Sequence, residues 1–169
     1  MVKAFYFLLL LAAIFTAAQA RSIVRRPQPH SSFKINITQI NPRSCSYTVR
    51  IATSCSSPRY TRDQISLSFG DAHGNQVYAP RLDDPSRRTF ERCSTDTFQV
   101  FGPCTYQICY LYLYRSGYDG WRPYSVEVYG YNVKPVTFYF DVFIPSNMWY
   151  GFNYCRQPYD ASASESTMK

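Results

Sequence analysis

Cysteine is the residue type with the most chemistry to offer in this chain. An even number of cysteines in an oxidising compartment is typical of disulfides, whereas zinc sites use closely spaced cysteine pairs, and no C-x-x-C pair occurs here. The two histidines, His30 and His73, fall in an arm and a loop. We therefore predict three disulfides and no metal at the cysteines, which are Cys45, Cys55, Cys93, Cys104, Cys109 and Cys155.

The sequence does not choose among the possible disulfide pairings. The order of the expected strands suggests one arrangement, in which the first and last core strands are tied together and a short loop is closed. The pairs in this arrangement are Cys45–Cys155, Cys104–Cys109 and Cys55–Cys93.

Catalytic groups are hard to find. A serine hydrolase on an α/β sheet needs a G-x-S-x-G turn, which the sequence lacks. A cysteine nucleophile needs a free thiol beside a base, and disulfides explain the cysteines better. A lone loop histidine such as His73 is usually solvated. We therefore expect a binding protein and not an enzyme.

The first 20 residues have the pattern of a secretory signal peptide. Lys3 precedes an apolar run over residues 4–18, and Ala18-Gln19-Ala20 is a small-x-small cleavage site. The run is shorter than the ~20 residues that a membrane-spanning helix needs, and no second hydrophobic segment follows. We predict a secreted chain with a flexible basic arm over residues 21–32, one domain over 33–155, a disordered tail over 156–169 and no transmembrane segment.

Arginine dominates the charge of this 169-residue chain, whose formal net charge is +7. A basic surface attracts anionic partners, such as acidic polysaccharide or lipid headgroups, although the same charge also serves solubility alone. Nucleic acid is not an expected partner, because no basic helix or RNA-binding signature occurs.

The stretch Ile108–Gly130 organises the expected fold. Period-two alternation makes both faces apolar from Ile108 to Tyr114, which is typical of a central strand. Residues 115–120 supply turn formers, a second strand follows over 125–131, and Trp121 can lock the two strands together. Further strands are expected at 33–40, 47–52, 65–69, 76–79, 97–101, 136–142 and 148–154. This pattern without helical periodicity predicts an all-β fold, an antiparallel β-sandwich of about eight strands.

The first of these strands carries a glycosylation sequon, Asn36-Ile37-Thr38. Because Asn36 falls on the polar face of the alternation and the chain is expected to be secreted, we predict that Asn36 is glycosylated.

The order of these features resembles the PLAT/LH2 domain, the sandwich found beside the catalytic part of lipoxygenases and some lipases. The segments that carry the likeness are YTVRIATS, DQISLSFGD, DTFQVFG, ICYLYLYRSGYDGWRPYSVEVYG and VTFYFDVFIPSNMWYGF. More closely, the chain resembles the plant embryo-specific protein 3 family, small secreted proteins with a lone PLAT-like domain. CSYTVRIATSCSS, SFGDAHGNQVY, FERCSTDTFQVFGPC and WYGFNYC carry that likeness.

The resemblance implies an extracellular plant protein, in the apoplast or cell wall, with a role in seed or embryo development. Three binding classes remain open, and association with another secreted or secretory-pathway protein through exposed tyrosines (Tyr129, Tyr131 and Tyr139) leads. PLAT domains are also associated with lipid or membrane contact, and the same rings could stack on cell-wall polysaccharide. The candidate binding residues are Arg115, Tyr118, Trp121, Arg122 and Tyr124, with Trp149 and Tyr150 as a second group.

Two points stay open at this stage. In the PLAT pattern the tryptophan after the turn packs in the core, so the resemblance favours a structural role for Trp121 over a surface one. Some PLAT-like domains bind calcium through loop oxygens, but no D-x-D-x-D run occurs, so we expect no cofactor, with calcium as a weaker alternative. The available donors are Asp71, Asn75, Asp83, Asp84 and Asp119.

Overall fold

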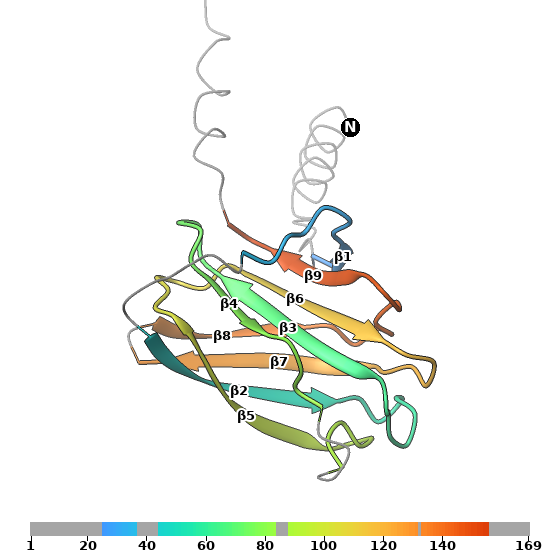
Figure 1. Ribbon diagram of the computed structural model, residues 1–169. Helices are drawn as coiled ribbons and strands as arrows, with labels where there is room; N and C mark the ends of the chain where they lie inside the picture. The colour runs from blue at the N-terminus through green and yellow to red at the C-terminus, as the bar shows by residue number, and fades with distance from the viewer. Residues whose placement is uncertain (1–24, 37–43, 84–87, 132, 156–169) are drawn as a thin grey trace, which may run out of the picture.

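Two antiparallel β-sheets packed face to face make up the fold (Figure 1). The computed structural model describes residues 25–36, 44–83, 88–131 and 133–155. The strands are β1 (Gln28–Pro29), β2 (Ser44–Thr53), β3 (Gln64–Gly70), β4 (Gln76–Ala79), β5 (Thr95–Pro103), β6 (Tyr110–Ser116), β7 (Pro123–Gly130), β8 (Val133–Tyr139) and β9 (Trp149–Asn153). The predicted antiparallel β-sandwich is confirmed.

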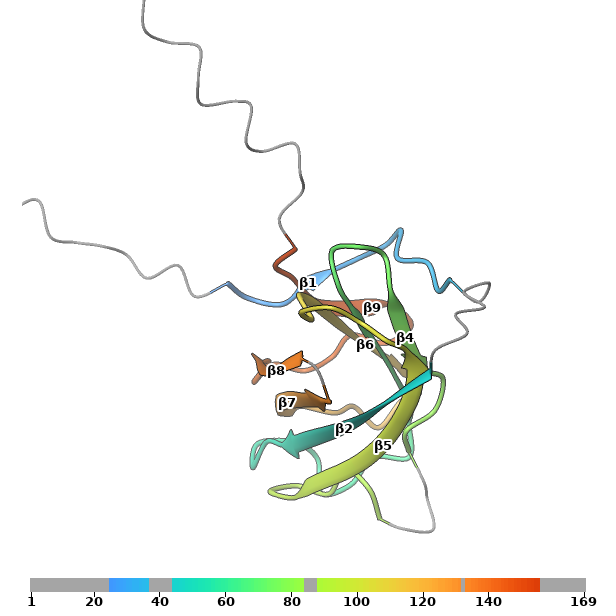
Figure 2. The same cartoon turned by 90° about the vertical axis from the view of Figure 1, so that its left-hand side faces the viewer.

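The strands are ordered β1-β9-β6-β3-β4 in a five-stranded sheet and β5-β2-β7-β8 in a four-stranded sheet. Figure 2 shows the two layers nearly end on. As predicted, β6 is a central strand, with β9 on one side and β3 on the other. Leu111 and Leu113 of β6 are fully buried between the sheets, and Tyr112 on its opposite face is also buried.

The prediction that β6 and β7 form a pair is wrong, because the two strands belong to different sheets. The connection over residues 117–122 crosses from one layer to the other. Its tryptophan, Trp121, lies in the core between the layers and is fully buried. Burial of Trp121 therefore favours a chain path from one sheet to the other, and not the hairpin that the sequence suggested.

The core fills the space between the sheets with side chains that alternate inward along each strand. Val49 and Ile51 of β2 face Leu67 and Phe69 of β3 in one continuous cluster of buried residues. Most outward positions on β2 and β5 are exposed or half-buried. This period-two pattern is the one that the sequence predicted.

The amino-terminal segment is more ordered than predicted. Gln28–Pro29 pairs with β9, so the expected flexible arm is a strand at these two residues. Phe33 then packs its ring on Tyr112 and Trp149, with ring centroids 4.6 and 5.1 Å apart. The strand expected from residue 33 is wrong for residues 33–36, which form no strand, because Phe33 covers the outer face of the five-stranded sheet. Residues 37–40, the whole predicted signal peptide, residues 21–24 of the arm and the predicted tail lie outside the described residues.

Three disulfides are present, and one of the three suggested pairs, Cys55–Cys93, is correct. The other two suggested pairs are wrong, since the bonds are Cys45–Cys104 and Cys109–Cys155. The pairing of the backbone around these cysteines explains both observed bonds. Cys45 lies opposite Gly102 on the neighbouring strand β5, and the Tyr154 amide donates to the Cys109 carbonyl at 2.7 Å. Strands β2 and β9, which the suggested Cys45–Cys155 bond would join, lie in different sheets.

Within the part of the chain that the structure describes, no helix is long and apolar enough to cross a membrane.

The outer face of the five-stranded sheet predicts an alkaline limit to stability. Burial raises the pKa of Tyr110 to about 12 from its ordinary value of 10.0. The folded protein therefore holds this proton more tightly than the unfolded chain, so its contribution is complete below pH 10 and is lost as the pH rises towards 12. We expect the melting temperature to fall less steeply over this range in Tyr110→Phe than in the wild type. Tyr131→Phe, at an exposed tyrosine, should keep the wild-type slope, and equal slopes in all three proteins would contradict the assignment.

Candidate binding surface at the loop end

Most of the predicted site residues gather at one end of the sandwich. Four loops meet there, namely residues 54–63, 80–94 with 84–87 undescribed, 117–122 and 140–148. This end, which we call the loop end, lies on the right of Figure 1. Cys55–Cys93 ties the first of these loops to the second.

A buried ion pair between Asp63 and Arg115 lies beneath the loop end. The side chains are only 4% and 10% exposed. Arg115 also donates to the carbonyls of Ile144 at 2.8 Å and Gly117 at 3.1 Å. The prediction that Arg115 belongs to a binding surface is wrong, because its charge faces Asp63 in the interior.

The Asp63 carboxylate also shapes the loop between β6 and β7. It accepts hydrogen bonds from the backbone amides of Asp119 and Gly120, both at 3.0 Å. Gly117, with φ of 147°, lies so close to Asp63 that a Cβ there would overlap the carboxylate. The turn therefore requires glycine at this position, and the carboxylate holds the turn in place.

Trp121 is part of the core and not of the surface, as the PLAT resemblance implied. Its ring is fully buried 4.8 Å from that of Phe90, and its Nε1 donates to Thr53 Oγ1 at 3.1 Å. A surface role for Trp121 is therefore wrong. The hydrogen bond satisfies the indole N–H that burial would otherwise leave unpaired.

The tip of the same loop is open to solvent. Tyr118 has a relative exposure of 105%, so no neighbour covers its side chain. Tyr60 and Phe143, at 54% and 52%, are also exposed on loops of this end. Arg122 is half-buried, with its guanidinium carbon 6.0 Å from the centre of the Phe143 ring. Exposed aromatic rings thus project from the loop end, with the half-buried Arg122 next to one of them.

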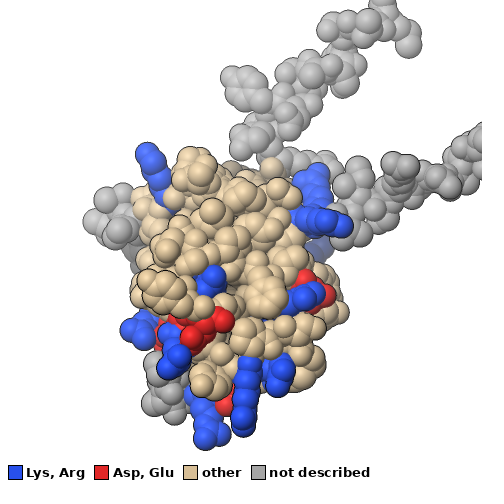
Figure 3. Space-filling model, turned by 90° about the vertical axis from the view of Figure 1, so that its right-hand side faces the viewer, with Lys and Arg blue, Asp and Glu red and all other residues tan. Residues whose placement is uncertain are grey.

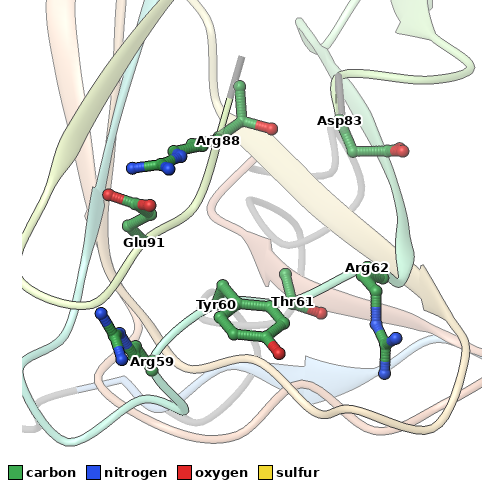
Figure 4. A pocket seen from close by; sticks show the side chains of 8 residues that line it. Arg59, Tyr60, Thr61, Arg62, Asp83, Arg88 and Glu91 are labelled. Atoms are coloured by element: carbon green, nitrogen blue, oxygen red, sulfur yellow. The ribbon is translucent and has the colours of Figure 1, made fainter. Parts of the chain in front are cut away.

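An arginine-rich cavity of about 390 Å³ opens beside this tip. Figure 4 shows its two walls, one from the loop before β3 and the other from the segments on either side of the undescribed residues. The charged and aromatic lining residues are Arg59, Tyr60, Arg62, Asp83, Arg88 and Glu91. We call this cavity the arginine cavity.

Several charges in the arginine cavity are already paired. Arg62 bonds both carboxylate oxygens of Asp119, at 3.1 and 3.2 Å, and these bonds lower the pKa of Asp119 below its ordinary value. Asp83 is bound by Arg81. Within the described residues, no ion pair is formed by Arg59 or Arg88, which are both exposed. Glu91 is the one other acidic residue in the described lining, so Arg59 and Arg88 together leave net positive charge there for an anion.

Lysine and arginine outnumber acidic residues on this side of the molecule. Figure 3 shows that they gather mainly over its lower part, with a few acidic residues between them. A face with this balance attracts anions over several ångströms at physiological salt.

The other predicted surface residues do not join this cluster. Trp149 is half-buried on the outer face of the five-stranded sheet, 5.3 Å from the Tyr114 ring. Tyr150 packs on the core from the opposite face of β9. The two residues therefore do not form the shared binding group that we predicted. Tyr124 is 49% exposed and lies beside Tyr139, on a separate part of the surface.

The sequon residue Asn36 is exposed, as a glycan there would require, and its backbone amide donates to the Gln76 side chain at 2.7 Å. Glycosylation itself stays a prediction.

The candidate calcium ligands are spread over both ends of the sandwich. Asp71 lies at the opposite end, where it accepts from the amides of His73, Asn75 and Tyr106 at 2.8–3.0 Å. At the loop end, Asp83 and Asp119 are bound by arginines. Asp84 lies outside the described residues. The described ranges contain no group of three or more His, Cys, Asp or Glu side chains that could hold a metal ion.

Sequence reasoning missed Asp63, Arg59 and Phe143. Asp63 falls between the strands expected at 47–52 and 65–69, and nothing in the sequence pattern there marks it as buried. The partner of this aspartate is 52 residues away, and only the neighbouring positions of β3 and β6 bring them together.

Removal of the Asp63 carboxylate should destabilise the protein strongly. Asp63→Ala leaves the Arg115 charge buried without a partner, which costs about 3–5 kcal/mol in other proteins. We expect a loss of that order in the free energy of unfolding from urea titrations. Asp119→Ala, which breaks an exposed ion pair in the same loop, is the matched control and should cost far less. Equal losses in the two variants would contradict the central role of Asp63.

Comparison with known proteins agrees with this architecture. The family model for Embryo-specific protein 3 (ATS3) matches residues 32–155. Embryo-specific protein ATS3B of Arabidopsis thaliana is 55% identical over 149 residues, which cover 88% of this chain and 78% of the relative. Embryo-specific protein ATS3A of the same plant is 49% identical over 171 residues, which cover 96% of each chain. These relatives are named for embryo specificity and not for a catalytic activity.

Solved structures with the same fold include coral 8R-lipoxygenase, with a TM-score of 0.55 and 20% identity over 64% of this chain. The alpha toxin of Clostridium absonum follows, with a TM-score of 0.53 and 19% identity over 64% of this chain. The match spans only 17% of the lipoxygenase and 31% of the toxin, so these similarities show the fold alone. Together with the sequence matches, they show that this chain belongs to the Embryo-specific protein 3 family and has a PLAT-like β-sandwich.

Proposed function

We propose that this protein is a secreted, non-catalytic binding module that docks through its loop end on anionic membrane surfaces. The observation that carries the proposal is Tyr118, whose side chain is fully exposed at the tip of a loop that Asp63 holds from below. Secretion is supported by the signal-like first 20 residues and the three disulfides. The names of the Arabidopsis relatives support a role in seed or embryo development.

The side chains at the loop end suit the headgroup region of a bilayer. Tyrosine has an apolar ring and a polar hydroxyl, so it favours the boundary between acyl chains and water. Arginine pairs with phosphate, and each basic residue near an anionic membrane contributes about 1 kcal/mol. Tyr118 and Phe143 would enter the interface, while Arg59 and Arg88 would meet the headgroups.

The alternative of a protein partner on exposed tyrosines has less support. Tyr131 precedes β8 and Tyr139 is the last residue of β8, so the two lie roughly 20 Å apart for a strand of this length. Tyr129 is half-buried on the outer face of the four-stranded sheet. These three residues are therefore spread along the sheet and form no compact aromatic cluster.

Docking is proposed to need no calcium. The description of coral 8R-lipoxygenase names calcium activation through a C2-like domain. Of the calcium donors predicted from the sequence, the two described ones at the loop end, Asp83 and Asp119, are each paired with an arginine. Arginine in place of calcium would supply the positive charge.

A vesicle flotation assay tests the proposal. The wild-type protein should float with vesicles that contain phosphatidylserine, in chelator as well as in calcium, and not with neutral phosphatidylcholine vesicles. Arg59→Gln combined with Arg88→Gln should weaken binding roughly thirtyfold, because two cationic contacts of about 1 kcal/mol are lost. Tyr118→Ala should weaken binding without changing its dependence on salt.

The matched control is Lys34→Gln combined with Lys134→Gln, which removes two exposed charges at the opposite end of the sandwich. This variant should bind almost as well as the wild type. Equal losses in both double variants would mean that net charge and not the loop end drives binding. If the protein floats with no vesicle, membrane docking is wrong and a protein or polysaccharide partner takes its place.

A further inference from the structure

A second cavity, of about 420 Å³, lies at the edge of the loop end, between the end of β2 and the starts of β5 and β7. It shares no lining residue with the arginine cavity. The Tyr124 ring and the Asp141 carboxylate line it together with Ser and Thr side chains and the Cys55–Cys93 disulfide. The Ser and Thr residues of the lining are Thr53, Ser54, Ser56, Ser94 and Thr95. We call it the hydroxyl cavity.

A β-bulge directs Tyr124 to the surface. Ala52 of β2 pairs with Ser125 of β7, but the next residue, Thr53, pairs with Pro123, so Tyr124 is the extra residue. A bulge of this kind re-aims a side chain that would otherwise follow the alternation of the strand. The Tyr124 ring then packs edge-on against Tyr139 at 6.0 Å and remains 49% exposed. One aromatic ring is thus held at the mouth of the hydroxyl cavity.

Asp141 presents a carboxylate on the same cavity in a fixed orientation. One oxygen, Oδ1, accepts from Ser54 Oγ at 3.2 Å and from Arg122 Nε at 3.1 Å. The Asp141 amide donates to the Pro123 carbonyl at 3.0 Å. Within the described residues Oδ2 accepts no hydrogen bond, and the side chain is 51% exposed. This oxygen is therefore available to a hydroxyl donor in the cavity.

The charge balance selects the class of ligand. Asp141 is the one charged side chain among the described residues that line the hydroxyl cavity, and Arg122 compensates its charge. An anion would meet a carboxylate there and no free cation. The hydroxyls of Thr53, Ser54 and Ser94 already have partners within the protein, but an apolar ligand would cover Asp141 Oδ2 and the exposed hydroxyls of Ser56 and Thr95 without bonding to them. A sugar ring fits both features, because its C–H face can pack on an aromatic ring while its hydroxyls bond to carboxylate and hydroxyl groups.

We propose that the hydroxyl cavity binds a neutral pyranose unit of a saccharide, with the sugar ring on Tyr124 and a sugar hydroxyl donating to Asp141 Oδ2. The site is independent of the membrane-docking surface, since the two cavities share no residue. Either proposal can therefore fail without the other.

Isothermal titration with neutral oligosaccharides tests the site. The probes are cellohexaose, xylohexaose and mannohexaose at millimolar concentration, followed by pull-down on the matching insoluble polysaccharides to distinguish free sugars from wall polymers. We expect at least one probe to bind the wild type. Tyr124→Ala should weaken that binding by about tenfold or more, since it removes the stacking wall, whereas Tyr124→Phe should retain it. Asp141→Asn should weaken binding too, because the amide that replaces the carboxylate is a weaker acceptor.

Tyr118→Ala, which removes an exposed tyrosine from the loop tip, is the matched control and should leave saccharide binding unchanged. Melting temperatures of all variants show whether a loss of binding comes from unfolding. The proposal is overturned if no probe binds the wild type, or if Tyr124→Ala and Tyr118→Ala bind equally well while both remain folded.

Discussion

The loop end depends on the buried ion pair between Asp63 and Arg115. These two side chains connect three loops, because Asp63 accepts from the amides of Asp119 and Gly120 and Arg115 donates to the Ile144 carbonyl. A buried ion pair adds little net stability over an apolar pair of the same size, since desolvation of the charges offsets their attraction. The ion pair instead fixes the conformation of the loops. Each hydrogen bond to the pair can form in only one arrangement of the loops, so the charges select the conformation in which Tyr118 points outward.

This arrangement separates two kinds of aromatic residue that look alike in the sequence. Trp121 and Tyr118 are three residues apart in one loop, yet one is fully buried and the other fully exposed. The hydrogen bonds to Asp63 lie between them in the chain, at Asp119 and Gly120. Trp121 closes the end of the core, and Tyr118 is left for contact with something outside the protein. A surface that is rigid below and exposed above loses little conformational entropy on binding.

Strand positions could be predicted well from the sequence because burial between two sheets produces period-two alternation along each strand. Residues 108–114 therefore indicated a central strand.

Long-range pairing could not be predicted in this way. The partner of Cys45 follows from the register of β2 on β5, and the change of sheet between β6 and β7 follows from the burial of Trp121. Arg115 was assigned to the surface for a related reason, because a charged residue after a strand usually faces solvent and its buried partner lies 52 residues away. Tyr124 was one of the candidate binding residues and is exposed, but the bulge that exposes it has no signature in the sequence.

The two proposed surfaces use different physical means of recognition. The arginine cavity offers unpaired positive charge, so its binding should depend on salt, whereas the hydroxyl cavity is close to neutral and should not. Both lie at the end of the sandwich where Cys55–Cys93 joins two loops. The opposite end is closed by the other two disulfides and presents no comparable cluster of arginines in the described residues.

Amide hydrogen exchange, measured with and without phosphatidylserine vesicles, tests the central claim most directly. In the free protein, the Asp119 and Gly120 amides should exchange as slowly as those of β6, because Asp63 binds both in the interior. Vesicles should then slow exchange in residues 58–62 and 117–120 and leave residues 72–75, at the opposite end, unchanged. Fast exchange at Asp119 and Gly120 in the free protein, or protection by vesicles at the opposite end, would contradict the account.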